Sequence, residues 1–213
     1  DFSENIKTME PNDFVRNILI KKLNAKVIVV GFNFRFGYKS KGDIDTLKQL
    51  RNKLNFDLSV IEPKMLGNNT ISSTLIRSLI KQGNISTANK MLGRSYSMIG
   101  QVIRGKGIGK KLGFATANLE INYSYTIPKL GVYKTYTYVE GKKYLSITNV
   151  GYNPTFNEKK INIESHILNF NGTLYGKKIA IDFIKFIREE KKFSSKKELI
   201  NQIESDIECL KKL

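Results

Sequence analysis

Cysteine and histidine are nearly absent from this sequence of 213 residues, which holds one cysteine, Cys209, and one histidine, His166. A single cysteine cannot form an internal disulfide, which excludes a disulfide-stabilised secreted scaffold and leads us to expect a reducing, cytoplasmic environment. One cysteine and one histidine also cannot build a Cys/His metal cluster. A Cys/His metal centre is therefore not expected in this protein.

Long apolar runs are also lacking. The strongest of them, such as residues 27–30, is far shorter than the roughly 20 residues that span a bilayer. The first residues are not followed by the apolar stretch of a signal peptide. We therefore expect neither a membrane partner nor secretion. The sequence begins at Asp1 without a methionine, which leads us to expect a fragment or a processed form.

Acidic residues are few: Asp and Glu number 19 against 36 Lys and Arg, a formal net charge of +17. Such an excess attracts polyanions, including nucleic acids, lipid headgroups and nucleoside phosphates. The alternative interpretation is a set of scattered, solvated lysines, because the chain contains no block of five or more like charges. Charge by itself leaves both interpretations open.

The first half of the chain alternates helical and strand patterns. A helical pattern begins at Pro11, and residues 26–30, with a continuous β-branched apolar run over 27–30, predict a buried strand. A loop over 31–37 follows, then a helix over 43–54 and a strand over 58–61. This order predicts an α/β unit with parallel strands, in which ligands bind beyond the carboxyl ends of the strands.

From about residue 95 the apolar pattern changes to period two, with turns in place of helices. It predicts five or six strands without intervening helices, and hence a small closed barrel, with strands over 96–103, 131–139, 144–150, 161–170 and 178–187. Ser195 and Glu198 have the spacing of a capping box and predict the start of a terminal helix. We therefore expect two modules, residues 1–93 and 94–213.

Three segments of the second module carry groups that bind phosphate or move protons. Gly105–Gly113 is rich in glycine and lysine, which suits either a phosphate cradle or a hairpin tip. Thr116 and Asn118 share one side of an extended segment, as Mg²⁺ ligands or as part of a solvated face. Glu164 and His166 also share a side, which could supply a general base or be a solvated polar face.

These segments resemble riboflavin kinases. Residues 113–119, Gly-Phe-Ala-Thr-Ala-Asn-Leu, are similar to the G-F-P-T-A-N motif of that family. Further segments resemble the family in the same order, namely 128–133, 149–156, 164–170, 174–176 and 188–193. The resemblance covers residues 93–213 and rests on several independent motifs.

The resemblance implies a six-stranded antiparallel Greek-key β-barrel with a C-terminal helix, which transfers the γ-phosphate of ATP to riboflavin and yields FMN and ADP. It implies that Thr116 and Asn118 hold Mg²⁺ and the nucleotide phosphates. Glu164 would orient or deprotonate the ribityl hydroxyl, and Arg188 with the terminal helix would border the flavin pocket. The residues implied to cover the phosphates are Gly105, Gly107, Gly109, Lys110 and Gly113.

The first half is similar to the α/β nucleotidyltransferase module of bacterial FAD synthetases, which adenylylates FMN. The similar segments are 31–37 and 71–77, and they imply phosphate contacts from Ser72, Ser73, Thr74 and Arg77. Ordinary helix capping is the other interpretation of these hydroxyls. The H-x-G-H motif of that module needs two histidines, and His166 is the only one here. We therefore expect an incomplete adenylylation site in this chain, and FAD synthesis only if a preceding part supplies the motif.

Three positions depart from the family patterns: Ala115 replaces proline, Lys110 replaces arginine and Asn33 replaces aspartate. These changes bear on rates and affinities. Two other functions compete with the kinase. A basic barrel in a chain with 10 tyrosines and 12 phenylalanines could bind single-stranded nucleic acid, and a catalytically silent remnant could bind flavin alone. We expect riboflavin and ATP as the partners, and no nucleic acid.

Overall fold

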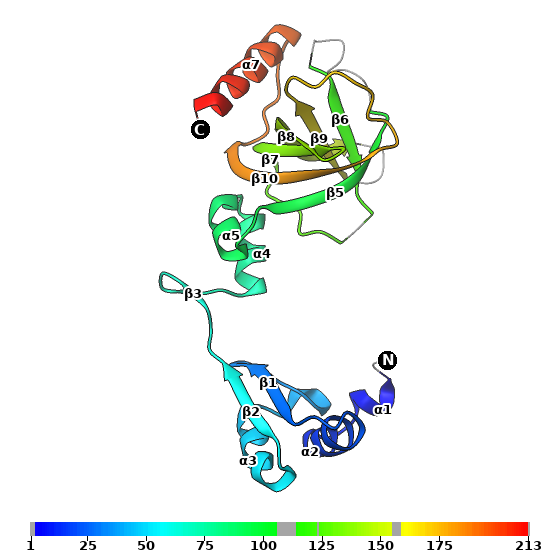
Figure 1. The fold of residues 1–213 in the computed structure, drawn as a ribbon. Coiled ribbons are helices and arrows are strands. Elements are labelled where there is room, and N and C mark those ends of the chain that lie inside the picture. Colours follow the sequence, from blue (N-terminus) through cyan, green and yellow to red (C-terminus); the bar gives the residue numbers. More distant parts are fainter. Residues whose placement is uncertain (1–2, 106–113, 123, 155–158, 213) are drawn as a thin grey trace. The chain divides into compact units, whose positions relative to one another are not determined.

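The structure is a computed structural model that describes residues 3–105, 114–122, 124–154 and 159–212. It consists of two compact units, Asp1–Ile71 and Ser72–Leu213 (Figure 1). Within the described ranges, no helix has the length and apolar character needed to cross a membrane.

The first unit is a small α/β structure, as the alternating pattern predicts. Strand β1 pairs with β2 in parallel, from Val27 opposite Asp57 to Gly31 opposite Ile61. Its elements are α1 (Glu4–Lys7), α2 (Pro11–Asp13), the π-helix η1 (Phe14–Lys22), β1 (Val27–Gly31), the 3₁₀ turn η2 (Tyr38–Ser40), α3 (Ile44–Leu54), β2 (Asp57–Ile61), β3 (Met65–Leu66) and β4 (Asn69–Thr70).

The prediction that the first strand is buried on both faces is wrong. Ile28 and Val30 are buried, but Val27 and Val29 are 57% and 61% exposed. The buried pair packs with side chains of η1 and α3 such as Val15 and Leu47, and none of the described elements of the first unit covers the opposite face. A continuous apolar run therefore shows that a strand is apolar, and does not show how many layers cover it.

Helix α3 begins with a reciprocal cap. The Asp43 carboxylate accepts hydrogen bonds from the Thr46 backbone N–H and hydroxyl, both at 2.9 Å, and Thr46 Oγ1 accepts the Asp43 N–H at 3.4 Å. The hydrogen bond from the Thr46 backbone is the main cause that lowers the pKa of Asp43 from its ordinary value of 3.8. Because the folded state has the lower pKa, this stabilisation is complete above the ordinary value and is lost as the pH falls below it.

Asp43→Ala should therefore loosen the start of α3 at neutral pH, because it leaves first-turn N–H groups without an acceptor. Hydrogen exchange of the α3 amides, compared between variant and wild type at the same pH, measures this effect. We expect faster exchange in the variant at pH 7, and a smaller difference once the pH lies well below 4. An equal difference at both pH values would contradict the role of the ionised carboxylate.

The second unit is built on a closed antiparallel barrel, as the period-two pattern and the resemblance predict. Its strands are hydrogen-bonded in the order β10-β5-β6-β9-β8-β7, so β6 and β7, consecutive in sequence, are not neighbours. The elements are α4 (Ser73–Lys81), α5 (Ile85–Leu92), β5 (Tyr96–Ile103), β6 (Thr116–Glu120), β7 (Gly131–Val139), β8 (Lys142–Pro154), β9 (Lys159–Ile167), β10 (Lys178–Arg188) and α7 (Lys196–Lys212).

The barrel interior contains an apolar part and a hydroxyl part. Phe183 and Tyr133 are fully buried with their rings 5.3 Å apart. Five other fully buried residues form a hydrogen-bonded hydroxyl network with O···O distances of 2.8–3.1 Å, namely Thr135, Thr137, Ser146, Thr148 and Ser165. Because Ser165 points inward, strand alternation turns its neighbours Glu164 and His166 to the outer face of the barrel.

Helices α4 and α5, which the sequence analysis assigned to the first module, pack in the second unit. Ile80, Ile85 and Ala88 are buried in the barrel's core cluster, and the Asn89 side chain bonds to the backbone of Phe183 at 2.8 Å. Packing therefore divides the chain between Ile71 and Ser72, earlier than the predicted boundary at residue 93. Helix periodicity shows that a helix has an apolar face and not what covers it, so the packing of α4 and α5 could not be derived from the sequence pattern.

Helix α7 begins close to the predicted cap. Ser195 Oγ accepts the Glu198 N–H at 3.2 Å, but the Glu198 carboxylate accepts the backbone N–H of Ser194 at 2.9 Å and not that of Ser195. The far half of the helix lies on the barrel, where Leu210 and Ile207 pack with residues of β7 and β8. The near half is therefore held close to the outer face that carries Glu164.

Candidate active site

Strand register brings the predicted polar residues together. Asn118 on β6 lies opposite Glu164 on β9, and Glu164 lies opposite Asn149 on β8. Two positions along, Thr116 lies opposite His166. Directly opposite residues have Cβ atoms about 5 Å apart, so oxygen-bearing side chains from three strands form one patch.

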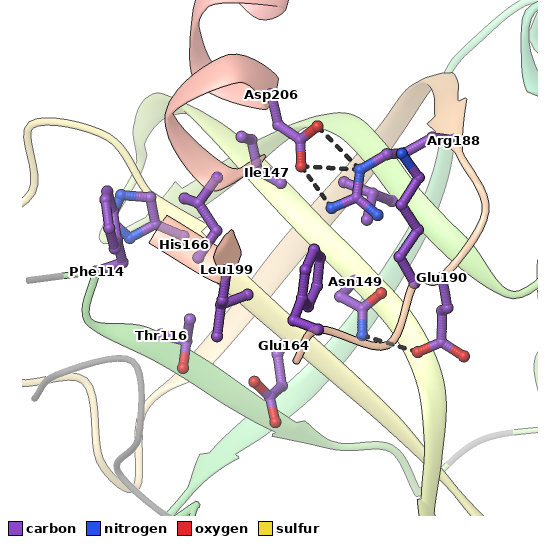
Figure 2. A pocket seen from close by; sticks show the side chains of 14 residues that line it. Phe114, Thr116, Ile147, Asn149, Glu164, His166, Arg188, Glu190, Leu199 and Asp206 are labelled. Atoms are coloured by element: carbon purple, nitrogen blue, oxygen red, sulfur yellow. Dashed lines mark hydrogen bonds and ion pairs between the residues drawn. The ribbon is translucent and has the colours of Figure 1, made fainter. Parts of the chain in front are cut away.

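A pocket of about 300 Å³ lies over this patch, and α7 forms its other side (Figure 2). Its wall combines apolar side chains from the barrel, from α7 and from the segment before α7 with charged groups. The lining residues are Phe114, Thr116, Val132, Ile147, Asn149, Glu164, His166, Arg188, Glu190, Lys191, Phe193, Leu199, Ile203 and Asp206.

Glu164 has a defined orientation at one end of this pocket. Asn162 Nδ2 donates a hydrogen bond to Glu164 Oε1 at 2.7 Å, which leaves Oε2 as a further acceptor. Figure 2 shows Glu164 and Thr116 at the same end of the pocket, away from Arg188 and Asp206. A carboxylate held in this way can accept a proton from a ligand hydroxyl that enters the pocket.

His166, the other sequence candidate for a general base, holds the backbone in place. Its Nδ1 lies 2.9 Å from the carbonyl oxygen of Ala115, and its ring meets Phe114 edge to face at 5.5 Å. A carbonyl only accepts hydrogen bonds, so Nδ1 carries the proton in this contact. The imidazole therefore anchors the residues just before Thr116.

The guanidinium of Arg188 is engaged by protein groups. Its Nε lies 2.9 and 3.1 Å from the two carboxylate oxygens of Asp206, and Nη2 lies 2.7 Å from Oδ2. Nη1 donates to the carbonyl of Glu189 at 2.9 Å. Arg188 thus borders the pocket, as the resemblance implies, while its donors connect β10 to α7.

A second pocket, of about 150 Å³, also includes Thr116 in its wall. Its lining includes inward-facing barrel residues and an aromatic group from the segment after β9, and consists of Val102, Ala115, Thr116, Ala117, Ser165, Ile167, Phe170, Gly172, Thr173, Leu174 and Tyr175. Asn118, two positions after Thr116, lies against Gly105, where an added Cβ would overlap the Asn118 side-chain amide. Thr116 therefore stands between two cavities.

The remaining predicted residues are placed as follows. Gly105 contacts Asn118, whereas Gly107, Gly109, Lys110 and Gly113 lie outside the described residues. Ser72 caps α4, because its Oγ accepts the N–H of Leu75 at 3.2 Å. Ser73, Thr74 and Arg77 lie in the first turns of α4, in the second unit, while the loop 31–37 belongs to the first unit.

The first unit has a pocket of its own at the carboxyl end of β1, where the parallel-sheet pattern predicts ligand sites. It lies between residues 32–35 and the start of α3, where Arg35 Nη1 and Asp43 Oδ2 are 3.3 Å apart.

Several lining residues of the pocket under α7 were not named as site residues by the sequence analysis, among them Ile147, Asn149, Glu190 and Asp206. For Asp206 a signal was present. It follows Leu199 by seven positions, so it lies on the apolar stripe of α7, where an acid must be paired if it is buried. Asn149 enters the site through its register opposite Glu164, and Glu190 through the hydrogen bond that its Oε1 accepts from Asn149 Nδ2 at 3.2 Å. Neither contact can be derived from the local sequence pattern.

Comparisons with known proteins agree with this architecture. The riboflavin kinase family profile matches residues 92–213, and that of FAD synthetases matches residues 1–75. A bifunctional riboflavin kinase/FMN adenylyltransferase of Buchnera aphidicola subsp. Schizaphis graminum is 41% identical over 215 residues, or 99% of this chain and 69% of that protein. The Bacillus subtilis protein of the same name is 37% identical, over 96% of this chain and 65% of that protein.

A crystal structure from Streptococcus pneumoniae, described as that of a macrolide-efflux protein, matches the whole chain with a TM-score of 0.90 at 32% identity and is itself covered to 68%. The family profile, the curated relatives and the barrel with its C-terminal helix all indicate a riboflavin kinase module. The chain belongs to the family of bifunctional riboflavin kinases/FMN adenylyltransferases.

Proposed function

We propose that the outer-face pocket under α7 binds riboflavin and that the smaller pocket beyond Thr116 binds the phosphates of ATP. The larger pocket offers apolar walls from Val132, Ile147 and Leu199, which suit a planar aromatic ring system. Its polar end holds Glu164 and Thr116, which suits a hydroxylated chain. Because both pockets include Thr116, a hydroxyl in one and a phosphate in the other would meet there.

The proposed reaction needs one proton acceptor. The ribityl hydroxyl oxygen forms a bond to the γ-phosphorus, the bond from that phosphorus to the bridging oxygen breaks, and ADP leaves. The hydroxyl proton passes to the carboxylate of Glu164, which Asn162 orients. The other side chains position the reactants, because phosphoryl transfer depends on alignment and charge neutralisation more than on covalent help.

Thr116 and Asn118 suit a magnesium ion in their chemistry. A hydroxyl and an amide oxygen are hard ligands, and Mg²⁺ is held by few protein groups together with substrate phosphates and water. Among the described residues, no three His, Cys, Asp or Glu side chains gather as a metal site, so the phosphates would complete the coordination. The ion, when bound, would neutralise phosphate charge during transfer.

Thr116→Val should test Thr116 as a magnesium ligand without disturbing its packing, because valine keeps the shape of threonine and removes the hydroxyl. We expect the Mg²⁺ concentration for half-maximal rate to rise and kcat/KM for ATP to fall, by about 10–100-fold. Thr87→Val on α5, which lines neither pocket, is the matched control. A Mg²⁺ dependence equal to that of wild type would contradict Thr116 as a ligand.

The relatives are named for two activities, and we propose that the parent protein of this chain also adenylylates FMN. The loop 31–37 and the start of α4 supply only part of such a site, and the sequence contains no H-x-G-H motif. The chain by itself is therefore expected to make FMN and to stop there.

The observation that carries the proposal is that Glu164 and Asn149, opposite each other on β9 and β8, line a pocket closed by α7 together with Thr116, while Asn118 lies opposite Glu164 on β6. The test is to incubate the chain with riboflavin, ATP and Mg²⁺ and to separate the flavins by chromatography. FMN without FAD is the expected product. Riboflavin binding without FMN formation would indicate a flavin-binding protein without kinase activity. FAD formation would contradict the expectation that the adenylylation site of this chain is incomplete.

A further inference from the structure

The strongest unused feature of the second unit is the buried ion pair between Arg188 and Asp206. The Arg188 side chain is 17% exposed and that of Asp206 is 5% exposed. Gln202 Nε2 donates a further hydrogen bond to Asp206 Oδ1 at 2.9 Å. A buried carboxylate is expensive unless it is paired and hydrogen-bonded, and here three hydrogen bonds from Arg188 and one from Gln202 satisfy it.

The position of this pair divides α7 into two halves. On the C-terminal side, Leu210 packs in a cluster with Val132 and Ile147, and Lys134 Nζ donates to the Leu210 carbonyl at 3.1 Å. On the N-terminal side, Leu199 and Ile203 are half-buried and line the pocket. The pair therefore lies between the C-terminal half of α7, which packs on the barrel, and the N-terminal half, which covers the pocket.

The pair is also remote from the reacting end of the pocket. Figure 2 shows the Arg188–Asp206 contact at the opposite end from Thr116 and Glu164. Residues of α7 line the larger pocket and none of the smaller one. A change in the position of α7 would therefore alter the flavin site and leave the nucleotide site as it is.

Resting on the function proposed above, we infer that Asp206 is a positioning residue for riboflavin: through Arg188 it holds the N-terminal half of α7 as the apolar wall over the flavin ring. Arg188 then acts on the flavin through the helix and not by a direct hydrogen bond, since its described donors face Asp206 and Glu189. Without the pair, the helix is docked for only part of the time. Riboflavin itself restores docking, because it binds the docked state.

Asp206→Asn tests this inference by its kinetic signature. If only a fraction of molecules has the helix docked, the apparent affinity for riboflavin is the intrinsic affinity multiplied by that fraction, while a saturating concentration recovers the rate. We expect KM for riboflavin to rise about tenfold or more, with kcat and KM for ATP nearly unchanged. Glu204→Gln, an acid-to-amide change at an exposed position of the same helix, should change none of these constants.

A double-variant comparison separates positioning from direct contact. Arg188→Gln alone leaves the Asp206 carboxylate buried without its cation, which is the most damaging arrangement. The combined variant Arg188→Gln/Asp206→Asn removes that charge and should bind riboflavin better than Arg188→Gln alone. If Arg188 bonds the flavin directly, the combined variant will be at least as impaired, and the inference is overturned.

A measurement on the wild-type chain covers the case in which the variants fail to fold. Hydrogen exchange of α7 is compared with and without riboflavin, and residues 196–203 are expected to gain protection while the barrel strands distant from the pocket do not. Unchanged hydrogen exchange at residues 196–203 on addition of riboflavin would contradict the claim that this half of α7 covers the flavin ring. A wild-type chain that makes no FMN contradicts the proposed function instead, and an active wild type with unaltered KM in Asp206→Asn contradicts the positioning role.

Discussion

Glu164→Gln should reduce kcat by about 10²–10⁴-fold, the range that a positioned general base contributes. Glutamine keeps the size of the side chain and can still accept the hydrogen bond from Asn162, which is 2.7 Å long in the wild type. It cannot accept the ribityl proton at neutral pH. The Kd for riboflavin and for ATP should therefore remain close to that of wild type while turnover is lost.

The measurement is single-turnover FMN formation at saturating riboflavin and ATP, together with flavin fluorescence titration of the variant. Glu208→Gln is the matched control, because Glu208 is an exposed acid on α7 that lines neither of the two pockets of the second unit. Full turnover in Glu164→Gln would show that the reaction needs no carboxylate at this position. Loss of riboflavin binding in parallel with turnover would assign Glu164 a binding role instead.

Phe183→Ala should have the largest effect on stability. Phe183 is fully buried, its ring meets Tyr133 at 5.3 Å and Tyr96 at 6.1 Å, and it lies in the core cluster that also receives α4 and α5. Truncation of a buried phenylalanine costs about 3–5 kcal/mol through lost burial and the remaining cavity. That is a large part of the roughly 5–15 kcal/mol that stabilises a typical domain.

Thermal unfolding followed by circular dichroism should show the barrel transition lowered by on the order of 10 °C or more. Tyr152→Ala is the control, since Tyr152 is 46% exposed on β8 and its loss should change the free energy of unfolding by less than about 0.5 kcal/mol. Phe183 lines neither pocket of the second unit, so the folded fraction of the variant should keep its kinase rate at low temperature. A midpoint equal to that of the control would mean that the core closes around the missing ring.

The local sequence pattern was sufficient to predict most of the helices and strands. Period-two alternation located the barrel strands, and the capping residue Ser195 begins the last helix. Glu140 and Gly141 form the hairpin turn between β7 and β8, with φ of 49° and 80°. These features depend on residues a few positions apart, so the sequence contains all that determines them. The same alternation placed Glu164 and His166 on one side of their strand.

The pairing between distant segments could not be derived in this way. That Asn118, Glu164 and Asn149 are cross-strand neighbours depends on the register of three strands, and register is a property of the closed barrel. The exposure of Val27 and the attachment of α4 and α5 to the barrel depend on which surface covers each apolar face. Sequence periodicity does not contain that information.

The composition, the motifs and their order were enough to identify a kinase of the riboflavin family and to name Thr116, Asn118 and Glu164 as its candidate residues. The tertiary structure decided that Thr116 and Glu164 line one pocket and that α7 forms its other wall. It also turned Arg188 toward Asp206, because a buried acid on the apolar stripe of α7 requires a partner. The reacting groups lie on one sheet and could be found from strand pattern, whereas the pocket is made by a helix that docks on that sheet through long-range contacts.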